Sequence, residues 1–130
     1  MSFEIVEIDA LLPHEEVDFE NYEVVSAGIA ENNIIEKAII VDKKSNVILD
    51  GHHRYSILLD LGCKFIPVVH VKYVQEDSFK LDFYPNKKHL RCSKEEILKK
   101  AVSGKLFPYK TTKHTHNLDL TCNVDLDRLF

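Results

Sequence analysis

Cysteine is scarce in this sequence. The only cysteines are Cys63, Cys92 and Cys122, which lie far apart and are odd in number. This spacing gives no support to a disulfide framework or to a C-x-x-C metal clip. Free thiols are typical of proteins in a reducing compartment, so we expect a cytoplasmic location.

Long apolar runs are also missing. No run approaches the roughly 18 residues that a membrane-spanning helix requires. The first four residues, Met-Ser-Phe-Glu, have neither the basic nor the apolar region of an export signal. We therefore expect no membrane anchor and no export.

A surplus of basic residues is missing too. The chain has 17 Lys and Arg against 21 Asp and Glu, a formal net charge of −4. Binding to a phosphate backbone needs an excess of Lys and Arg on at least one face. The composition therefore disfavours nucleic acid as a partner, although it leaves room for a local basic groove.

Without repeats, low-complexity tracts or linkers, the sequence is a series of short elements. With 130 residues and 45% hydrophobic content, we expect one core and a single domain over residues 1–130. The apolar patterns predict strands at residues 3–8, 38–41, 47–49, 65–73, 79–83 and 118–124, the first of them at an edge, and helices at 21–32, 51–61 and 93–103. This mixture indicates an α+β fold, a mixed sheet with interspersed helices.

Polar residues mark the ends of the predicted helices. Asn21 is a candidate cap for the first helix, and the pair Asn32 and Asn33 should end it. Ser93 and Glu96 form a capping box at the start of the last helix. The residues of the first helix that we expect to face inward are Val24, Val25, Ala27 and Ile29.

The densest polar cluster follows a predicted strand and opens a predicted helix. It reads Asp50, Gly51, His52, His53 and Arg54. The start of a helix has unpaired N–H groups and a partial positive charge, which favour an anion such as phosphate. Gly51 would let phosphate approach the backbone, the two imidazoles and Arg54 could donate hydrogen bonds, and Asp50 could hold a metal or take a proton. The plain alternative is a turn followed by capping or solvated histidines.

A second polar segment lies near the end of the chain, within residues 105–116. It contains Lys110, Thr111, Thr112, Lys113 and His114. Cations, hydroxyls and an imidazole are a phosphate-binding composition, but a solvated basic loop is the plain alternative. His114 and His116 could share one strand face as metal ligands, yet no third ligand is apparent, so we assign no zinc.

An acidic pair follows the first predicted strand. Pro13 breaks the chain just before His14, Glu15 and Glu16, which places these residues at a strand-to-helix junction or in a first helical turn. The plain alternative is a solvated helix start. We expect only one of the two glutamates to have a functional role, and the sequence leaves open which.

The motifs together resemble the ParB/sulfiredoxin-like domain. The resemblance covers about residues 4–74. It is carried by Leu12-Pro13-His14-Glu15, Ile39-Ile40-Val41, the run from Val47 through Asp50 to Tyr55, Leu61-Gly62-Cys63 and Ile66-Pro67-Val68. The resemblance implies a mixed sheet with interspersed helices in one compact domain.

Within that superfamily, the pattern is most similar to the free serine kinases. Sulfiredoxins have a catalytic cysteine where His52 stands, and the partition proteins add a helix-turn-helix DNA reader, for which residues 75–130 are too short and too rich in strands. The kinases combine a His-Glu, an Asp-Gly-x-His-Arg-Tyr and a Lys-(Ser/Thr)-Thr-Arg-His segment. Here these correspond to residues 14–15, 50–55 and 110–114, with Lys113 in place of the arginine and a middle segment shortened to about residues 76–104.

The resemblance implies a role for each matching residue. Glu15 would accept the proton of the substrate hydroxyl, and Asp50 would assist catalysis or place a metal. Gly51, His52, His53 and Arg54 would hold the nucleotide phosphates, and Lys110, Thr111, Thr112, Lys113 and His114 would close over phosphate or product.

We therefore expect phosphoryl transfer from ATP or ADP, with Mg²⁺, to a small hydroxyl substrate, with L-serine as the expected acceptor and O-phospho-L-serine as the product. A ParB-like regulatory or DNA-associated module that binds CTP or ATP without kinase activity is the alternative. A nuclease is a weaker third reading, which the acidic balance disfavours. The donor nucleotide, the metal ligands and the oligomeric state stay open.

Overall fold

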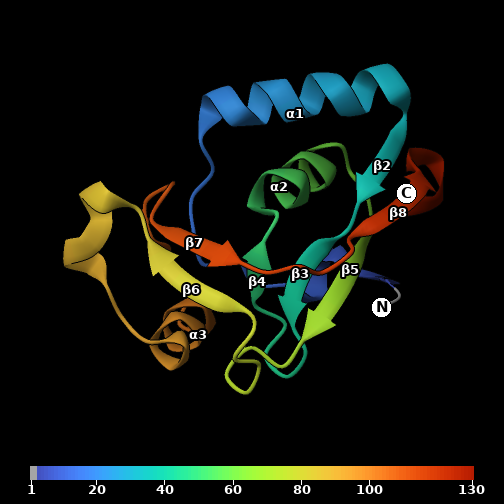
Figure 1. Cartoon of the computed structure of the whole chain (residues 1–130). Coiled ribbons are helices and arrows are strands. Elements are labelled where there is room, and N and C mark those ends of the chain that lie inside the picture. The colour runs from blue at the N-terminus through green and yellow to red at the C-terminus, as the bar shows by residue number, and fades with distance from the viewer. Residues whose placement is uncertain (1–2) are drawn as a thin grey trace.

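The centre of the protein is a four-stranded mixed sheet. A computed structural model describes residues 3–130. The sheet order is β1-β5-β3-β4, formed by β1 (Glu4–Glu7), β5 (Phe65–Val71), β3 (Ile39–Asp42) and β4 (Ile48–Asp50) (Figure 1). β3 and β5 are parallel, and the other two pairs are antiparallel. The predicted α+β class, the four strands and the edge position of the first one are confirmed.

The sheet is buried on both faces. Ile39 and Val41 of β3 contact one core cluster, together with Ile57 of α2 (His52–Asp60). Ile40, which points the other way, belongs to a second cluster with Ile97 of α3 (Lys94–Val102). The alternation of side chains along a strand thus explains why the run at 38–41 is apolar throughout.

The first helix, α1 (Phe19–Asn32), packs against α2 on one side of the sheet (Figure 1). Its cap is Asp18, whose carboxylate accepts a hydrogen bond from the Glu20 N–H at 3.1 Å, so the prediction that Asn21 caps it was wrong. Of the residues predicted to face inward, Ile29 is buried and Val25 half-buried, whereas Val24, 71% exposed, and Ala27, also exposed, face solvent. Asn33, in the left-handed conformation with φ of 57°, ends the helix as predicted.

Two small sheets flank the central one. β2 (Ile34–Lys37) pairs with β8 (Thr121–Asp125), and β6 (Lys80–Phe83) pairs with β7 (Thr112–Thr115), both antiparallel. The strands β6 and β8 were predicted, whereas β2 was not. β7 lies inside the polar segment 105–116, for which the sequence left a phosphate-binding segment and a solvated loop open. It forms a strand because it pairs with β6 in regular register, Leu81 opposite His114 and Asp82 opposite Lys113.

The remaining helices are α3 and three short 3₁₀ helices. The capping box of α3 is confirmed, because the Ser93 hydroxyl accepts from the Glu96 N–H at 3.2 Å and the Glu96 carboxylate accepts from the Ser93 N–H at 3.1 Å. Three short 3₁₀ helices were not predicted: η1 (Ile8–Ala10), η2 (Pro85–Leu90) and η3 (Leu126–Leu129). Within residues 3–130, no helix is both long and apolar enough to cross a bilayer.

Candidate functional site

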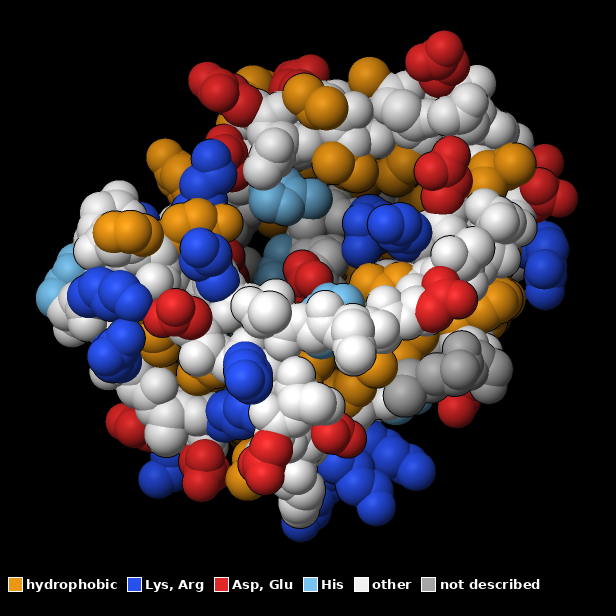
Figure 2. Space-filling model, viewed as in Figure 1, with side chains coloured by type: hydrophobic (Ala, Val, Ile, Leu, Met, Phe, Trp, Pro, Cys, Tyr) orange, Lys and Arg blue, Asp and Glu red, His pale blue; other side chains and the backbone are white. Residues whose placement is uncertain are grey.

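A cavity of about 650 Å³ opens where the end of β4, the start of α2 and the strand β7 meet. This volume lies in the range of small-molecule and cofactor sites, about 300–1,000 Å³. Figure 2 shows the hollow, with histidine and acidic side chains inside it and Lys or Arg side chains around its rim. Its walls are formed by Glu15, Asn21, Val25, Lys37, Leu49, Asp50, Gly51, His52, His53, Arg54, Tyr84, Lys110, Thr112, His114, His116 and residues 118–121.

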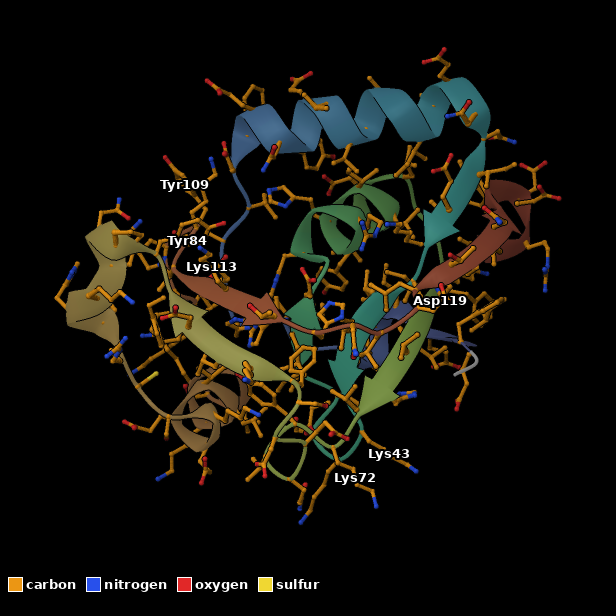
Figure 3. All side chains as sticks on the ribbon, viewed as in Figure 1. Lys43, Lys72, Tyr84, Tyr109, Lys113 and Asp119 are labelled. Atoms are coloured by element: carbon orange, nitrogen blue, oxygen red, sulfur yellow. The ribbon has the colours of Figure 1, made fainter. Side chains whose placement is uncertain are left out.

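Every residue predicted for the site lines this cavity except Thr111 and Lys113. Thr111 is fully buried, and its hydroxyl donates to the Pro108 carbonyl. Lys113 is exposed, with its Nζ 5.2 Å from the centre of the Tyr84 ring (Figure 3). The alternation of β7 explains the split, because Thr112 and His114 face inward and Lys113 faces away.

The turn before α2 brings backbone close to the cavity. Gly51 has a φ of 98°, and a Cβ at this position would lie 2.7 Å from Ile39 Cβ. Only glycine fits such a conformation at such a distance. The first N–H groups of α2 have no partner within the helix, and the residues that carry them, His52, His53 and Arg54, line the same cavity as Gly51. Such a helix start is suited to an anion, as the sequence predicts.

The first two residues of α2, His52 and His53, each make a contact that the sequence did not indicate. Nε2 of His52 accepts a hydrogen bond from the His14 N–H at 3.1 Å, and Nε2 of His53 accepts from the Asp18 N–H at 3.0 Å. Burial lowers the pKa of both imidazoles, that of His52 well below its usual range. A neutral ring whose Nε2 accepts has its proton on Nδ1, so only that nitrogen can donate to a ligand.

Arg54 is a half-buried cation without an acidic partner within ion-pair distance. Its Nη2 donates to the Ala38 carbonyl at 3.4 Å, and its Nε is buried with no hydrogen-bond partner among the described residues. The ion pairs formed by residues 3–130 do not include it. Burial lowers the pKa of the guanidinium, with Asp50 acting in the opposite sense. An unpaired cation at the start of a helix is suited to an anionic ligand.

Glu15, and not Glu16, reaches the cavity. One oxygen of its carboxylate accepts from both the backbone N–H and the hydroxyl of Thr112, each at 2.8 Å. Burial raises the pKa of Glu15, although these bonds and the N–H groups of Thr111 and Lys110 lower it. Glu16 is exposed, and its N–H donates to the Phe107 carbonyl at 2.8 Å. A half-buried carboxylate with a raised pKa is a candidate general base.

Asp50 stands at the end of β4, on the cavity wall. Its side chain is half exposed, and its Oδ2 lies 3.8 Å from His116 Nε2. Figure 3 shows Asp119, a second carboxylate of the wall, near β8 and on the opposite side from Tyr84. In the described part of the chain, no group of three or more His, Cys, Asp or Glu is placed to hold a metal ion by itself.

Part of the wall comes from residues that no motif indicated. Asn21 and Val25 come from α1 and Lys37 from β2, and these elements reach the cavity only through the tertiary fold. His116, for which the sequence supports no zinc site, also lines the cavity. His114 has its Nε2 2.7 Å from the Tyr73 hydroxyl, and burial lowers its pKa to about 3.

No family model matches the chain. An ATP-dependent L-serine kinase from Staphylothermus marinus is 28% identical over 85 residues, which are 62% of this chain and 34% of that protein. A ParB-like protein from Sulfolobus acidocaldarius is 44% identical over 70 residues, 51% of this chain and 33% of that protein. The matches thus span about a third of the length of these curated relatives.

The match in structure extends over the whole chain. A free serine kinase in complex with AMP superposes with a TM-score of 0.83 at 17% identity, covering 99% of this chain and 94% of the other. At this identity the superposition shows a shared fold. The resemblance to the ParB/sulfiredoxin-like superfamily is therefore confirmed in sequence by the two relatives and in architecture by this structure.

Proposed function

We propose that this chain is a nucleotide-dependent phosphotransferase that acts on free L-serine and forms O-phospho-L-serine. One observation carries the proposal: a half-buried carboxylate with a raised pKa, Glu15, and a half-buried cation without an ion-pair partner, Arg54, line the same cavity. The first is suited to take a proton from a hydroxyl, and the second to bind phosphoryl oxygens.

The phosphate side of the cavity is the start of α2. The N–H groups after Gly51, the guanidinium of Arg54 and the Nδ1–H groups of His52 and His53 supply hydrogen-bond donors there. Fixed donors of this kind stabilise the charge that spreads over the phosphoryl oxygens during transfer. Lys110, which is exposed on the rim and paired with Asp18 at 3.2 Å, adds a further positive charge.

The acceptor side of the cavity is Glu15. The proton of the serine hydroxyl would pass to its carboxylate while the serine oxygen forms a bond to the terminal phosphorus. The bond between that phosphorus and the bridging oxygen breaks, and the electron pair leaves with the nucleotide, ADP from ATP or AMP from ADP. Positioning and charge neutralisation supply the catalysis in such a reaction.

Asp50 would hold Mg²⁺. In nucleotide sites this ion is bound by one or two carboxylates, while phosphate oxygens and water complete its octahedron. Asp50 and Asp119 both present carboxylates on the cavity wall, so the donor set fits. The ion would neutralise charge on the phosphoryl oxygens when bound.

The comparisons support this proposal from two sides. A relative named as an L-serine kinase matches in sequence, and a free serine kinase solved with AMP matches in fold.

We also propose a cytoplasmic location, in keeping with three cysteines that are all free thiols. We further propose that the single domain is divided into a motif region at residues 4–74 and a phosphate segment at residues 105–116.

The second candidate is a nucleotide-binding regulatory module without kinase activity. It is favoured by the ParB-like relative, which at 44% identity matches a shorter segment more closely than the kinase does. Such a module would use the α2 site for a nucleoside triphosphate and would leave Glu15 without a chemical role.

A single assay separates the two candidates. The protein is incubated with ATP or ADP, Mg²⁺ and L-serine, and O-phosphoserine is followed by phosphorus NMR, with melting temperatures measured in parallel with CTP and with DNA. Serine-dependent product supports the kinase. A nucleotide-dependent rise in melting temperature without any phosphoserine would reject it in favour of the regulatory module.

A further inference from the structure

The neighbouring residues His14 and Glu15 and the distant Thr112 form a continuous line of side chains that runs from the cavity wall inward. Glu15 Oε1 lies 2.8 Å from Thr112 Oγ1, and Thr112 Oγ1 lies 3.0 Å from His14 Nε2. The far end of the line is the Ile48 carbonyl, 2.6 Å from His14 Nδ1. His14 is completely buried, so this line reaches from the cavity into the core.

The number of protons in this line can be counted from its chemistry. The Ile48 carbonyl can only accept, so His14 carries its proton on Nδ1, and Nε2 of the neutral ring can only accept. Thr112 then has one hydroxyl proton for two contacts, one to Glu15 and one to His14. With Glu15 ionised, one of these two contacts has no proton and cannot be a hydrogen bond. One proton added to the line makes both contacts hydrogen bonds.

The neighbours of His14 determine where the added proton goes. The His52 and His114 rings lie 4.6 Å and 6.0 Å from the His14 ring, and Asp50 is the charge that favours the imidazolium. Burial is the larger effect and lowers the pKa of His14 to about 4. Burial raises the pKa of Glu15. The added proton is therefore held on Glu15, and His14 stays a neutral acceptor.

We propose that Glu15, Thr112 and His14 act as one proton acceptor, in which Thr112 and His14 are positioning residues. With Glu15 ionised, the Thr112 hydroxyl donates to the carboxylate. When Glu15 takes up a proton, its new O–H donates to Thr112 Oγ1, and the Thr112 hydroxyl turns to His14 Nε2. The buried imidazole nitrogen gains its donor only in this second state, which makes Glu15 a stronger base.

The catalytic meaning of this line rests on the proposed function. In phosphoryl transfer the O–H bond of the serine hydroxyl breaks and an O–H bond forms on Glu15; the rotation of the Thr112 hydroxyl moves no further proton and leaves His14 uncharged. Loss of this proton to water restores the first state. The coupling of Glu15 to His14 is a property of the protein without substrate, so it can be tested separately from the reaction.

The test is NMR of the whole chain labelled with ¹³C in glutamate and ¹⁵N in histidine, titrated without nucleotide or serine. The Glu15 carboxyl carbon and the His14 Nε2 nitrogen should change with the same pH midpoint in the wild type and in Thr112→Ser, which keeps the hydroxyl. In Thr112→Val, which has the same shape without the hydroxyl, Glu15 should still titrate and the His14 nitrogen should no longer follow it. In Glu15→Gln, the His14 nitrogen should show no step at that midpoint.

Two results would overturn the proposal: a His14 nitrogen that does not respond to the Glu15 titration in the wild type, or one that still responds in Thr112→Val. Where O-phosphoserine is formed, Thr112→Val should also lower kcat by about 10- to 100-fold with the KM for nucleotide unchanged, and Thr112→Ser should recover most of the loss. A protein that forms no phosphoserine but shows the coupled titration would reject the serine kinase and retain the proton acceptor.

Discussion

The backbone N–H of His14 donates to Nε2 of His52 at 3.1 Å. This contact joins the segment that carries Glu15 to the first residue of α2. His53 repeats the arrangement with the Asp18 N–H, which lies at the cap of α1. His52 and His53 therefore hold the segment from His14 to Asp18, which carries Glu15, against the start of α2. This role is separate from any contact that they make with a ligand.

Removing the acceptor of this bond should destabilise the protein. His52→Leu leaves the buried N–H of His14 without a partner, which should lower the free energy of unfolding by about 1–3 kcal/mol in urea titrations. His52→Gln, which can offer a side-chain oxygen, should lose less. Equal stability of the two variants would show that the bond to His14 contributes nothing.

Glu15→Gln should strongly slow phosphoryl transfer and keep nucleotide binding. The amide cannot take the serine proton, so kcat should fall by about 10²- to 10⁴-fold, while calorimetric titration with ADP should give an unchanged Kd. Glu16→Gln is the matched control, because Glu16 is exposed and lies outside the cavity. Full activity of Glu15→Gln would reject Glu15 as the base.

Arg54→Met should weaken nucleotide binding without destabilising the fold. Loss of a charged hydrogen-bond donor should raise the Kd for ADP by about 10- to 100-fold. Because the guanidinium has an unpartnered buried Nε, its removal should leave the free energy of unfolding equal or higher. Lys113→Met, which removes a cation outside the cavity, should leave the Kd unchanged. A Kd for ADP that rises in Lys113→Met and stays unchanged in Arg54→Met would place the anion site outside this cavity.

Gly51→Ala should be strongly destabilising. A side chain at φ of 98° is strained, and its Cβ would lie 2.7 Å from that of Ile39. The two effects together should lower the free energy of unfolding by about 2–4 kcal/mol. Gly28→Ala is the contrasting variant, since no atom lies within 4 Å of a Cβ there and the residue is inside α1. It should be stabilising by about 0.5–1 kcal/mol in the same urea titration.

Stability should fall in acid because of the buried imidazoles. The pKa of His14 is lowered from 6.5 to about 4 in the folded protein, so only the unfolded chain binds a proton between these values. The contribution of neutral His14 to the free energy of unfolding is fully present above pH 6.5. It is lost as the pH falls to about 4, a loss of about 3 kcal/mol. His14→Gln should therefore show a shallower decline of the free energy of unfolding between pH 7 and pH 4. Parallel pH dependences of the two proteins would contradict this expectation.

The local part of the site could be predicted from the sequence. The strand that ends in Asp50, the turn at Gly51 and the start of α2 depend only on neighbouring residues. The turn and the unpaired amides after it therefore follow from the local sequence.

The cap of α1 shows the limit of such reasoning. Asp18 and Asn21 are both good caps, and the exposed Phe19 at the start of the helix gave no apolar pattern to choose between them.

The distant part of the site could not be predicted in the same way. The strand β7 consists of Thr112, Lys113, His114 and Thr115, which are all polar, so its period of two has no hydrophobic signal. Only its pairing with β6 reveals which side chains face the cavity. The contributions of Asn21 and Lys37 depend on how α1 and β2 pack, which no local motif records.

The bond between the Glu15 carboxylate and the Thr112 N–H spans 97 positions of the chain. Closing so large a loop is entropically costly, and contacts of such high sequence separation form late in folding. The turn at Gly51, by contrast, needs only its immediate neighbours. During refolding, affinity for nucleotide should therefore return before turnover, and the delay between the two would measure the docking of the C-terminal strands onto a scaffold that is already formed.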